Sequence, residues 1–289
     1  MGTEMYELDA VLPEGLHCLT YDDGTLQQMW QHPDSDIRQA GFPSGHVEEW
    51  IRRQRASSRR ADTCCVSTRW AAGSFAEEYG LPEERIRVVG MGHRPRFVAN
   101  AGKDWNAPRY LFVGVDWKRK NGASVLESFR IVRRRFPAAR LDIVGRAPAI
   151  EEPGVQVHGF LPREEPSAQK LLDKLYESAT CFVLPSLFDP SPISYLEAGS
   201  AGLPVIATGV GGAGELLGAG AVVVDPKNGA EISAAMLSLA NPESARTTGA
   251  VASRHAARAS WDRVGGRILR ALEETGAGSA VVDFRKAAQ

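Results

Sequence analysis

Residues 180–208 have the sequence TCFVLPSLFDPSPISYLEAGSAGLPVIAT, in which two apolar runs flank a stretch with helical character. The runs 180–184 and 204–208 are nearly all apolar, as are strands that are covered on both faces of a parallel sheet. The helix between them is expected to begin near Pro192, because proline is tolerated at the first helical position, and to end around Gly202. A strand, a helix and a second strand in this order predict a parallel α/β architecture.

The same alternation continues along most of the chain. Further strands are expected at 16–21, 63–67, 86–89, 109–113, 140–144 and 221–224, and helices with one apolar face at 123–136 and 167–178. Residues 92–108 show neither pattern and are rich in glycine, proline, asparagine and arginine, so they are expected to link two domains. We therefore expect a partial α/β domain at 1–100, with three strands, and a complete Rossmann-like α/β domain at 101–259, with five. A C-terminal helix and tail should occupy 260–289.

Composition limits the classes of function. The 289 residues carry a net charge of −1, so no global positive field favours nucleic acid or an anionic membrane as a partner. The most basic stretch is the set of arginines within 52–60. It fits a solvated helix face, and the alternative is contact with a membrane surface or an acidic partner. No apolar run reaches the ~18 residues of a spanning helix, and no signal-peptide pattern opens the chain.

The four cysteines are Cys18, Cys64, Cys65 and Cys181, and none belongs to a CxxC pair. Three of them fall in apolar runs that are expected to be buried strands, where cysteine behaves as a small hydrophobic residue. A disulfide framework or a zinc site is therefore not expected, and a reducing compartment fits. We expect the protein in the cytoplasm.

The loop after strand 109–113 has a composition that suits a diphosphate. Its sequence is GVDWKRKNG at 114–122, and a helix follows. Gly114 permits close approach of the backbone, and Lys118, Arg119 and Lys120 precede the amino terminus of the helix. In open parallel sheets ligands bind in such loops, beyond the carboxyl ends of strands, where ammonium groups and helix amides act together. The alternative is a solvated turn that happens to be basic.

The loop after strand 180–184 places two acids around the amino terminus of a helix. If this helix starts at Pro192, Glu197 lies about one and a half turns in, and its side chain leans back toward the loop that holds Asp189. The amides of Ile193 and Ser194 can hold a phosphate, whereas the carboxylates are better suited to accept hydrogen bonds from sugar hydroxyls. The alternative makes Asp189 a capping or turn residue and Glu197 a solvated helix position.

Two other segments carry weaker signals. The turn GVGG at 209–212 could approach a phosphate, or it could simply turn tightly between a strand and a helix. The segment HGFLP at 158–162 could form a wall for a flat base, and His158 within it is expected to be structural rather than catalytic.

Taken in order, these pieces resemble the carboxyl-terminal domain of GT-B-fold glycosyltransferases of family 4, the large retaining family, over roughly 109–261. The hallmark is a pair of acids separated by seven residues, a small-residue stretch, a Gly-x-Pro strand and a Gly-Gly turn with glutamate. Here it runs from Asp189 to Glu197, through AGSAGLPVIAT at 198–208, to GGAGE at 211–215. The ordered set is specific, although no single piece is.

The resemblance implies roles for individual residues. Lys120 corresponds to the lysine that clamps the donor diphosphate, with Arg119 as a helper, and Asp189 to the acid that holds the donor sugar. The implied donor-binding positions are Leu161 for the base through its backbone, the Ile193 and Ser194 amides for the distal phosphate, and Glu197 for the ribose. The donor is expected to be a UDP-sugar or GDP-sugar, and neither a metal nor a cofactor is expected.

The chain also departs from the family. Asp189 stands where the family usually has glutamate, which is longer by one methylene. The stretch after it is PSP at 190–192, with two prolines that lack amide donors, and Val115 replaces an arginine near the first glycine. The segments 21–25, 67–70 and 86–90 resemble only the later units of the amino-terminal acceptor domain, so the early units of that domain are expected to be missing.

The resemblance implies a retaining glycosyltransferase with an unknown acceptor, in which Lys120, Arg119 and a helix terminus stabilise charge on the leaving nucleoside diphosphate. One alternative is a non-catalytic subunit that binds nucleotide-sugar or a partner. Another is a different GT-B enzyme, such as an epimerase or a phosphorylase, although no pyridoxal-phosphate lysine is evident. A dehydrogenase is disfavoured, because no Gly-x-Gly-x-x-Gly opens a βαβ unit with an acid about 20 residues on.

Overall fold

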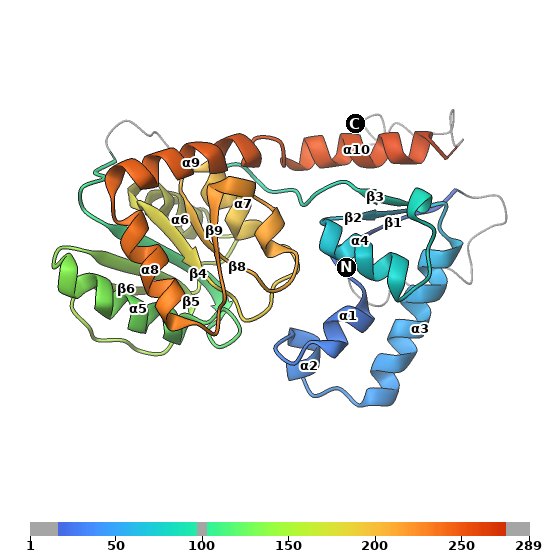
Figure 1. Cartoon of the computed structure of the whole chain (residues 1–289), viewed down its shortest axis with the longest axis horizontal. Coiled ribbons are helices and arrows are strands. Elements are labelled where there is room, and N and C mark those ends of the chain that lie inside the picture. The colour runs from blue at the N-terminus through green and yellow to red at the C-terminus, as the bar shows by residue number, and fades with distance from the viewer. Residues whose placement is uncertain (1–16, 97–102, 276–289) are drawn as a thin grey trace.

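The computed structural model describes residues 17–96 and 103–275 of the chain. These residues form two α/β units that lie side by side, and the last helix extends from the second unit back over the first (Figure 1). The units are called here the N-terminal unit and the C-terminal unit.

The N-terminal unit is built on a parallel three-stranded sheet in the order β1-β2-β3. Its strands are β1 (Leu19–Asp22), β2 (Thr63–Val66) and β3 (Ile86–Val88). Its helices are α1 (Leu26–Gln31), α2 (Asp36–Gln39), α3 (Ser44–Arg60), α4 (Arg69–Glu77) and the 3-10 turn η2 (Glu83–Arg85). Thr25, Ser35 and Thr68 cap α1, α2 and α4, and each accepts a hydrogen bond from the amide three residues on.

The C-terminal unit holds a six-stranded parallel sheet in the order β6-β5-β4-β7-β8-β9. Its strands are β4 (Arg109–Asp116), β5 (Arg140–Arg146), β6 (Val155–Gly159), β7 (Cys181–Leu184), β8 (Val205–Thr208) and β9 (Ala221–Val224). Its helical segments are α5 (Gly122–Arg135), α6 (Pro166–Ser178), α7 (Ile193–Ser200), η3 (Ala213–Glu215), η4 (Gly218–Gly220), α8 (Gly229–Leu239) and α9 (Pro242–Ala256). This strand order is that of the doubly wound Rossmann-like fold, which confirms the expected fold class.

The strand order defines a topological switch point between β4 and β7. The chain runs outward from β4 through β5 to β6, and then returns to the other side of β4 as β7. The loops that leave β4 and β7 therefore diverge above adjacent strands, which is where open α/β sheets bind ligands. These are the loops that hold Lys120 and Asp189.

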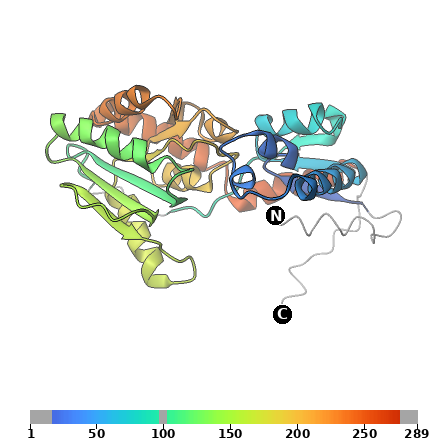
Figure 2. The same ribbon diagram turned by 90° about the horizontal axis from the view of Figure 1, so that it is seen from below.

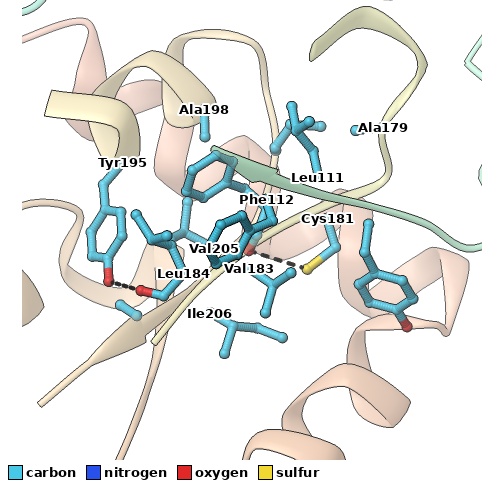
Figure 3. Packing of buried hydrophobic residues seen from close by; sticks show 14 of the residues in the cluster. Leu111, Phe112, Ala179, Cys181, Val183, Leu184, Tyr195, Ala198, Val205 and Ile206 are labelled. Atoms are coloured by element: carbon cyan, nitrogen blue, oxygen red, sulfur yellow. Dashed lines mark hydrogen bonds between the residues drawn. The ribbon is translucent and has the colours of Figure 1, made fainter. Parts of the chain in front are cut away.

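The core of the C-terminal unit fixes α7 against the sheet. Tyr195 is fully buried, and its hydroxyl donates to the Leu184 carbonyl at 2.6 Å (Figure 3) and accepts from the Thr208 amide at 3.0 Å. Burial raises the pKa of Tyr195 well above its ordinary value, which keeps the donating proton in place. One side chain thus ties α7 to the carboxyl ends of β7 and β8, and so sets where its amino terminus lies.

The last helix, α10 (Trp261–Glu273), returns to the N-terminal unit. Its Val264 and Ala271 are buried in a cluster with Cys65 of β2 and Val89, and Figures 1 and 2 show the helix beside the small sheet. Arg267 adds a hydrogen bond from Nε to the Val89 carbonyl. Helix α10 therefore covers apolar side chains on one face of the three-stranded sheet.

The expected elements differ from the structure at several places. The sequence predicted five strands after the linker, and this was wrong, because β6 (Val155–Gly159) is a sixth. β6 pairs only with β5 and is half-buried, so it lacks the continuous apolar run of the central strands. Helix α7 begins at Ile193, one residue later than expected, with Pro192 as its N-cap. Residue 16 of the first expected strand lies outside the described residues.

The arginines of α3 have partners within the molecule. Arg52 and Arg53 pair with Glu49, Arg55 lies over the Tyr79 ring at 5.1 Å, and Arg59 donates to the Tyr79 carbonyl at 3.0 Å. Arg60 donates to the Cys18 sulfur at 3.1 Å. The pairs with Glu49 lie within α3, whereas the contacts of Arg55, Arg59 and Arg60 favour a role in holding α3 on its own unit. No helix within the described ranges is long and apolar enough to cross a membrane.

Candidate functional site

A cleft of about 790 Å³ lies between the two units. Its wall on the C-terminal unit is formed by residues of the β4–α5 and β7–α7 loops and the start of α7: Arg119, Lys120, Asp189, Pro190 and Ile193. The opposite wall comes from β1, α1, α2, α3 and α10, and includes Asp22, Asp23, Asp36, Gln54 and Trp261. The cleft therefore opens at the switch point of the larger sheet.

The β4–α5 loop holds Lys120 against the strand that it leaves. The amide of Lys120 donates to the Asp116 carbonyl at 2.9 Å, and Asn121 adopts a left-handed conformation with φ of 61° before α5 begins. A side chain at Gly114 would lie 2.8 Å from Cγ of Lys120, so only glycine leaves room for the lysine stem. Gly114 thus lies beside Lys120 and is not part of the cleft lining.

Arg119 joins the two loops of the C-terminal wall. Its carbonyl accepts a hydrogen bond from the Leu187 amide at 2.8 Å, and its guanidinium donates to the Phe188 carbonyl at 3.3 Å. Its Nε lies 3.7 Å from a carboxylate oxygen of Asp116. The guanidinium is therefore directed along the β7–α7 loop, next to Lys120.

Asp189 is buried at the base of the cleft. Its carboxylate accepts hydrogen bonds from the Lys120 ammonium and, at 3.2 Å, from the Ser186 hydroxyl. A side chain at Gly211 would lie 2.2 Å from the Asp189 carbonyl, and φ at this glycine is +88°. The glycine-rich turn 209–212 therefore supports Asp189 by close packing, and in this structure the turn is not part of the cleft lining.

The amino terminus of α7 reaches the same cleft. Ile193 is its first residue and lines the cleft, whereas Ser194 follows it in the first turn and does not. The first-turn amides of an α-helix have no partner within the helix and carry its positive dipole end. Two side-chain cations and a helix terminus therefore meet around one space, which is an arrangement that binds phosphate groups.

Two predicted donor-binding residues lie elsewhere. Glu197 accepts hydrogen bonds from Arg96 of the interdomain segment and from the Tyr176 hydroxyl, each at 3.3 Å, and its side chain is 15% exposed. Leu161 packs against the hydrophobic core beyond the end of β6. Neither belongs to the cleft lining. Arg96 was not predicted, because no motif marks it and 101 residues separate it from Glu197.

His158 takes part in a structural network. Its Nε2 lies 2.7 Å from a carboxylate oxygen of Asp142 on β5, and Arg109 of β4 donates to the other oxygen at 2.6 Å. Asp142 is buried, so the Arg109 guanidinium compensates its charge, and each of its carboxylate oxygens has a polar partner. The contacts support the structural role expected for His158. Within the described ranges, no three His, Cys, Asp or Glu side chains are grouped as a metal site would group them.

The acidic wall of the cleft was not predicted as part of a site. The Ser191 hydroxyl donates to Asp23 at 3.4 Å, which connects the β7–α7 loop to β1. Burial raises the pKa of Asp23, and the negative charge of Asp189 raises it further. The segment 21–25 was expected to belong to the later units of an acceptor domain, but no role was assigned to its acids, and nothing in the sequence indicates that Asp23 meets a loop 168 residues away.

Glu215 connects the units on one side of the cleft. Its two carboxylate oxygens accept hydrogen bonds from the amides of Arg69 and Trp70, both at 2.9 Å. These amides belong to the first turn of α4, where donors lack partners within the helix. Nearby, Phe188 stacks on His32 with centroids 4.5 Å apart and meets the Trp70 ring edge-on at 5.8 Å. The relative placement of the two walls therefore depends on Glu215 of the C-terminal unit, whose carboxylate caps α4 of the N-terminal unit.

Replacing Glu215 by alanine should speed hydrogen exchange at the Arg69 and Trp70 amides and cost about 1 kcal/mol of stability, the typical value of a helix cap. Helix α4 should persist, because Thr68 still caps it through the Ala71 amide. Exchange measured by mass spectrometry or NMR checks this, with Glu243→Ala in the exposed first turn of α9 as the control. Unchanged exchange at residues 69 and 70 contradicts a capping role for Glu215.

Comparison with known proteins gives the class of the larger unit. Residues 107–241 match the family described as "Glycosyl transferases group 1". The chain is 26% identical over 283 residues to D-inositol 3-phosphate glycosyltransferase of Segniliparus rotundus, an alignment that covers 88% of this chain and 62% of that protein. The chain thus spans less than two thirds of the length of this relative.

Solved structures share the fold of both units. Sucrose-phosphate synthase from Thermosynechococcus elongatus superimposes with a TM-score of 0.71 at 19% identity, over 95% of this chain and 71% of that one. The pneumococcal O-GlcNAc transferase, solved in complex with UDP and GlcNAc, superimposes with a TM-score of 0.62 at 14% identity, over 78% of this chain and 48% of that one. The fold is therefore that of the GT-B glycosyltransferases, and the domain match supports membership of that class.

Proposed function

We propose that this protein is a retaining glycosyltransferase of family 4, which binds a UDP-sugar or GDP-sugar in the cleft between its units and transfers the sugar to an acceptor. The observation that carries the proposal is that Arg119, Lys120 and the amino terminus of α7 line one cleft at the switch point of the sheet. The group 1 domain match over 107–241 supports the same reaction class.

In this proposal the C-terminal wall stabilises the leaving group. As the bond between sugar and diphosphate breaks, negative charge accumulates on the nucleoside diphosphate. The Lys120 ammonium and the Arg119 guanidinium would lie beside the diphosphate, and the Ile193 and Ser194 amides would meet the distal phosphate. These groups are fixed by the loop contacts before donor arrives, so little reorganisation accompanies bond cleavage.

The other residues predicted from the sequence keep the roles proposed for them, and the contacts of Asp189 and Glu197 add a condition to each of those two roles. Asp189 would exchange its Lys120 partner for a hydroxyl of the donor sugar, and Gly114 would keep the lysine in position. The Leu161 backbone would contact the base. Glu197 would bind the ribose only while sharing its oxygens with Arg96 and Tyr176.

Calorimetric titration with UDP, GDP and their sugars tests the donor site. We expect one of the two nucleoside diphosphates to bind, with affinity that falls at high salt because cations contact the phosphates. Transfer is then measured with the sugar of that nucleotide and the anomeric configuration of the product is read by NMR. Absence of heat with every nucleotide contradicts the proposal, and an inverted product contradicts the retaining outcome.

A second candidate function is that of a subunit that binds nucleotide-sugar without transferring it. It is favoured by Asp189, an aspartate where the family usually has glutamate. Binding of donor with no turnover toward a panel of acceptors would support it. For either function we infer a cytoplasmic location, because the four cysteines are free thiols, which suits a reducing compartment.

A further inference from the structure

The two walls of the cleft differ in charge. Among the described residues that line it, the cations are Arg119 and Lys120, and both belong to the C-terminal unit. The N-terminal unit contributes the carboxylates of Asp22, Asp23 and Asp36. A donor diphosphate held on the cationic wall therefore leaves an acidic wall for whatever molecule receives the sugar.

Asp22 is held in place by a buried glutamine. The Gln54 carbonyl oxygen accepts from the Leu26 amide at 2.7 Å and from the Tyr79 hydroxyl at 2.5 Å, so the NH₂ group of Gln54 must be the end that faces Asp22. That group lies 3.4 Å from a carboxylate oxygen of Asp22. The Gln54 NH₂ group thus donates to the Asp22 carboxylate and fixes its position at the edge of the cleft.

Asp23 lies where the acidic wall approaches the site of transfer. It belongs to the N-terminal unit, yet it receives a hydrogen bond from Ser191 in the loop that holds Asp189. An acceptor hydroxyl that donates to Asp23 would therefore lie close to the sugar that Asp189 is proposed to hold.

Trp261 adds a flat apolar surface to the same wall. It is the first residue of α10, lines the cleft and is 46% exposed, and its ring meets Tyr21 edge-on with centroids 6.3 Å apart. An exposed indole packs against the C–H face of a ring, while carboxylates accept hydrogen bonds from hydroxyls at its rim. Together these groups are suited to an uncharged ring that carries hydroxyls.

Resting on the function proposed above, we propose that the acceptor is an uncharged polyol or sugar, without phosphate or carboxylate groups, whose reacting hydroxyl is positioned by Asp23. A phosphorylated acceptor would place its charge against Asp22, Asp23 and Asp36, and among the described lining residues no cation of the N-terminal unit compensates it. The curated relative is named for a phosphorylated inositol. The acidic wall indicates a different acceptor class for this chain.

Matched acceptor pairs test the proposal: myo-inositol with D-inositol 3-phosphate, glucose with glucose 6-phosphate, and fructose with fructose 6-phosphate. We expect transfer to at least one neutral member, at least about tenfold faster than to its phosphorylated partner, since each carboxylate repels the phosphate. Transfer to a phosphorylated member at an equal or higher rate overturns the proposal, and so does absence of transfer to every neutral member. Calorimetric binding of the donor nucleotide, measured alongside, keeps these outcomes distinct from failure of the donor site.

Asp23→Asn separates positioning from a structural role. Among the described residues, the charged and titratable groups around Asp23 are Tyr21, Asp22 and Asp36 of its own unit, and Asp189, Arg119 and Lys120 across the cleft. Because the pKa of Asp23 is raised in the folded protein, its contribution to stability is present at low pH and is lost as pH rises through that pKa. The variant should therefore have a higher Tm than the parent protein at neutral pH, and the gain should shrink as pH falls.

In the same variant, transfer to the neutral acceptor should fall about tenfold or more, the KM for the donor should stay unchanged, and the preference against the phosphorylated acceptor should weaken. Glu48→Gln removes one negative charge from an exposed position of the same unit and is the control. A lowered Tm with unchanged acceptor preference would mean that Asp23 serves only to hold the units together, and would overturn its positioning role.

Discussion

Replacement of Lys120 by alanine is expected to lower the rate of sugar transfer by roughly 10²-fold or more, the cost of removing a fixed group that stabilises developing charge. The Lys120 side chain is 14% exposed, so solvent screens its charge much less than that of a surface lysine. Its position is set by the Asp116 carbonyl and by the absence of a side chain at Gly114. The affinity for the nucleoside diphosphate should fall less than the rate, because leaving-group charge is greatest in the transition state.

Steady-state rates and calorimetric affinities measured on the same preparations check this prediction. Lys118→Ala is the matched control, because Lys118 is an exposed cation two residues away and does not line the cleft. Both variants have the same net charge, so a general effect of charge on the rate at which the donor reaches the protein would appear in both. Turnover of Lys120→Ala equal to that of the control would remove Lys120 from the proposed machinery.

The meeting of Lys120, Asp189 and Ile193 could be predicted from the sequence, and the physical reason is topological. Parallel strands put their carboxyl ends on one edge of the sheet, so every strand-to-helix loop faces the same side. Strands β4 and β7 are largely buried and have apolar sequences, so both can be identified from the single sequence. Their adjacency follows from the doubly wound order, and the two loops then converge at the switch point.

The other wall could not be predicted, because it depends on how two units dock. Asp23 meets Ser191, and Glu215 meets the amides of Arg69 and Trp70, across separations of 168, 146 and 145 residues. Hydrophobic periodicity does not predict such contacts, because each of these polar residues fits the local sequence pattern equally well as a solvent-exposed residue. The same holds for Glu197, whose helix position was predicted but whose partner, Arg96, lies in a segment without regular structure.

The ion pair joins Lys120, which is proposed to bind the donor diphosphate, to Asp189, which is proposed to bind the donor sugar. Both side chains are largely buried, at 14% and 7% exposure, so each compensates a charge that would otherwise be costly in the cleft. A donor that brings a diphosphate to Lys120 and a hydroxyl to Asp189 would replace this one pair with two interactions of matching polarity. The pair therefore holds both groups in position until donor binds, and each can be tested apart from the other.

Asp189→Asn should separate donor binding from transfer. The variant leaves Lys120 without its counter-charge, so the cleft becomes more positive and the affinity for UDP or GDP should rise severalfold. Transfer should nevertheless fall by about 10- to 100-fold, which corresponds to the loss of a hydrogen bond of about 1.5–3 kcal/mol between a charged carboxylate and the donor sugar. Stability should fall by less than the about 3–5 kcal/mol of a fully buried broken pair, because asparagine still accepts a hydrogen bond from Lys120.

Calorimetry, steady-state transfer and thermal unfolding, measured together, distinguish the roles that Asp189 can have. Asp116→Asn is the control, because it removes an exposed charge at the end of β4, beside Arg119, from a residue that does not line the cleft. Tighter nucleotide binding with unchanged transfer would make Asp189 a counter-ion for Lys120 and nothing more. Weaker binding would mean that the carboxylate is needed to hold Lys120 in position for the diphosphate, since the gain in positive charge would then be outweighed by lost geometry. Only tighter binding combined with slower transfer fits a carboxylate that contacts the donor sugar.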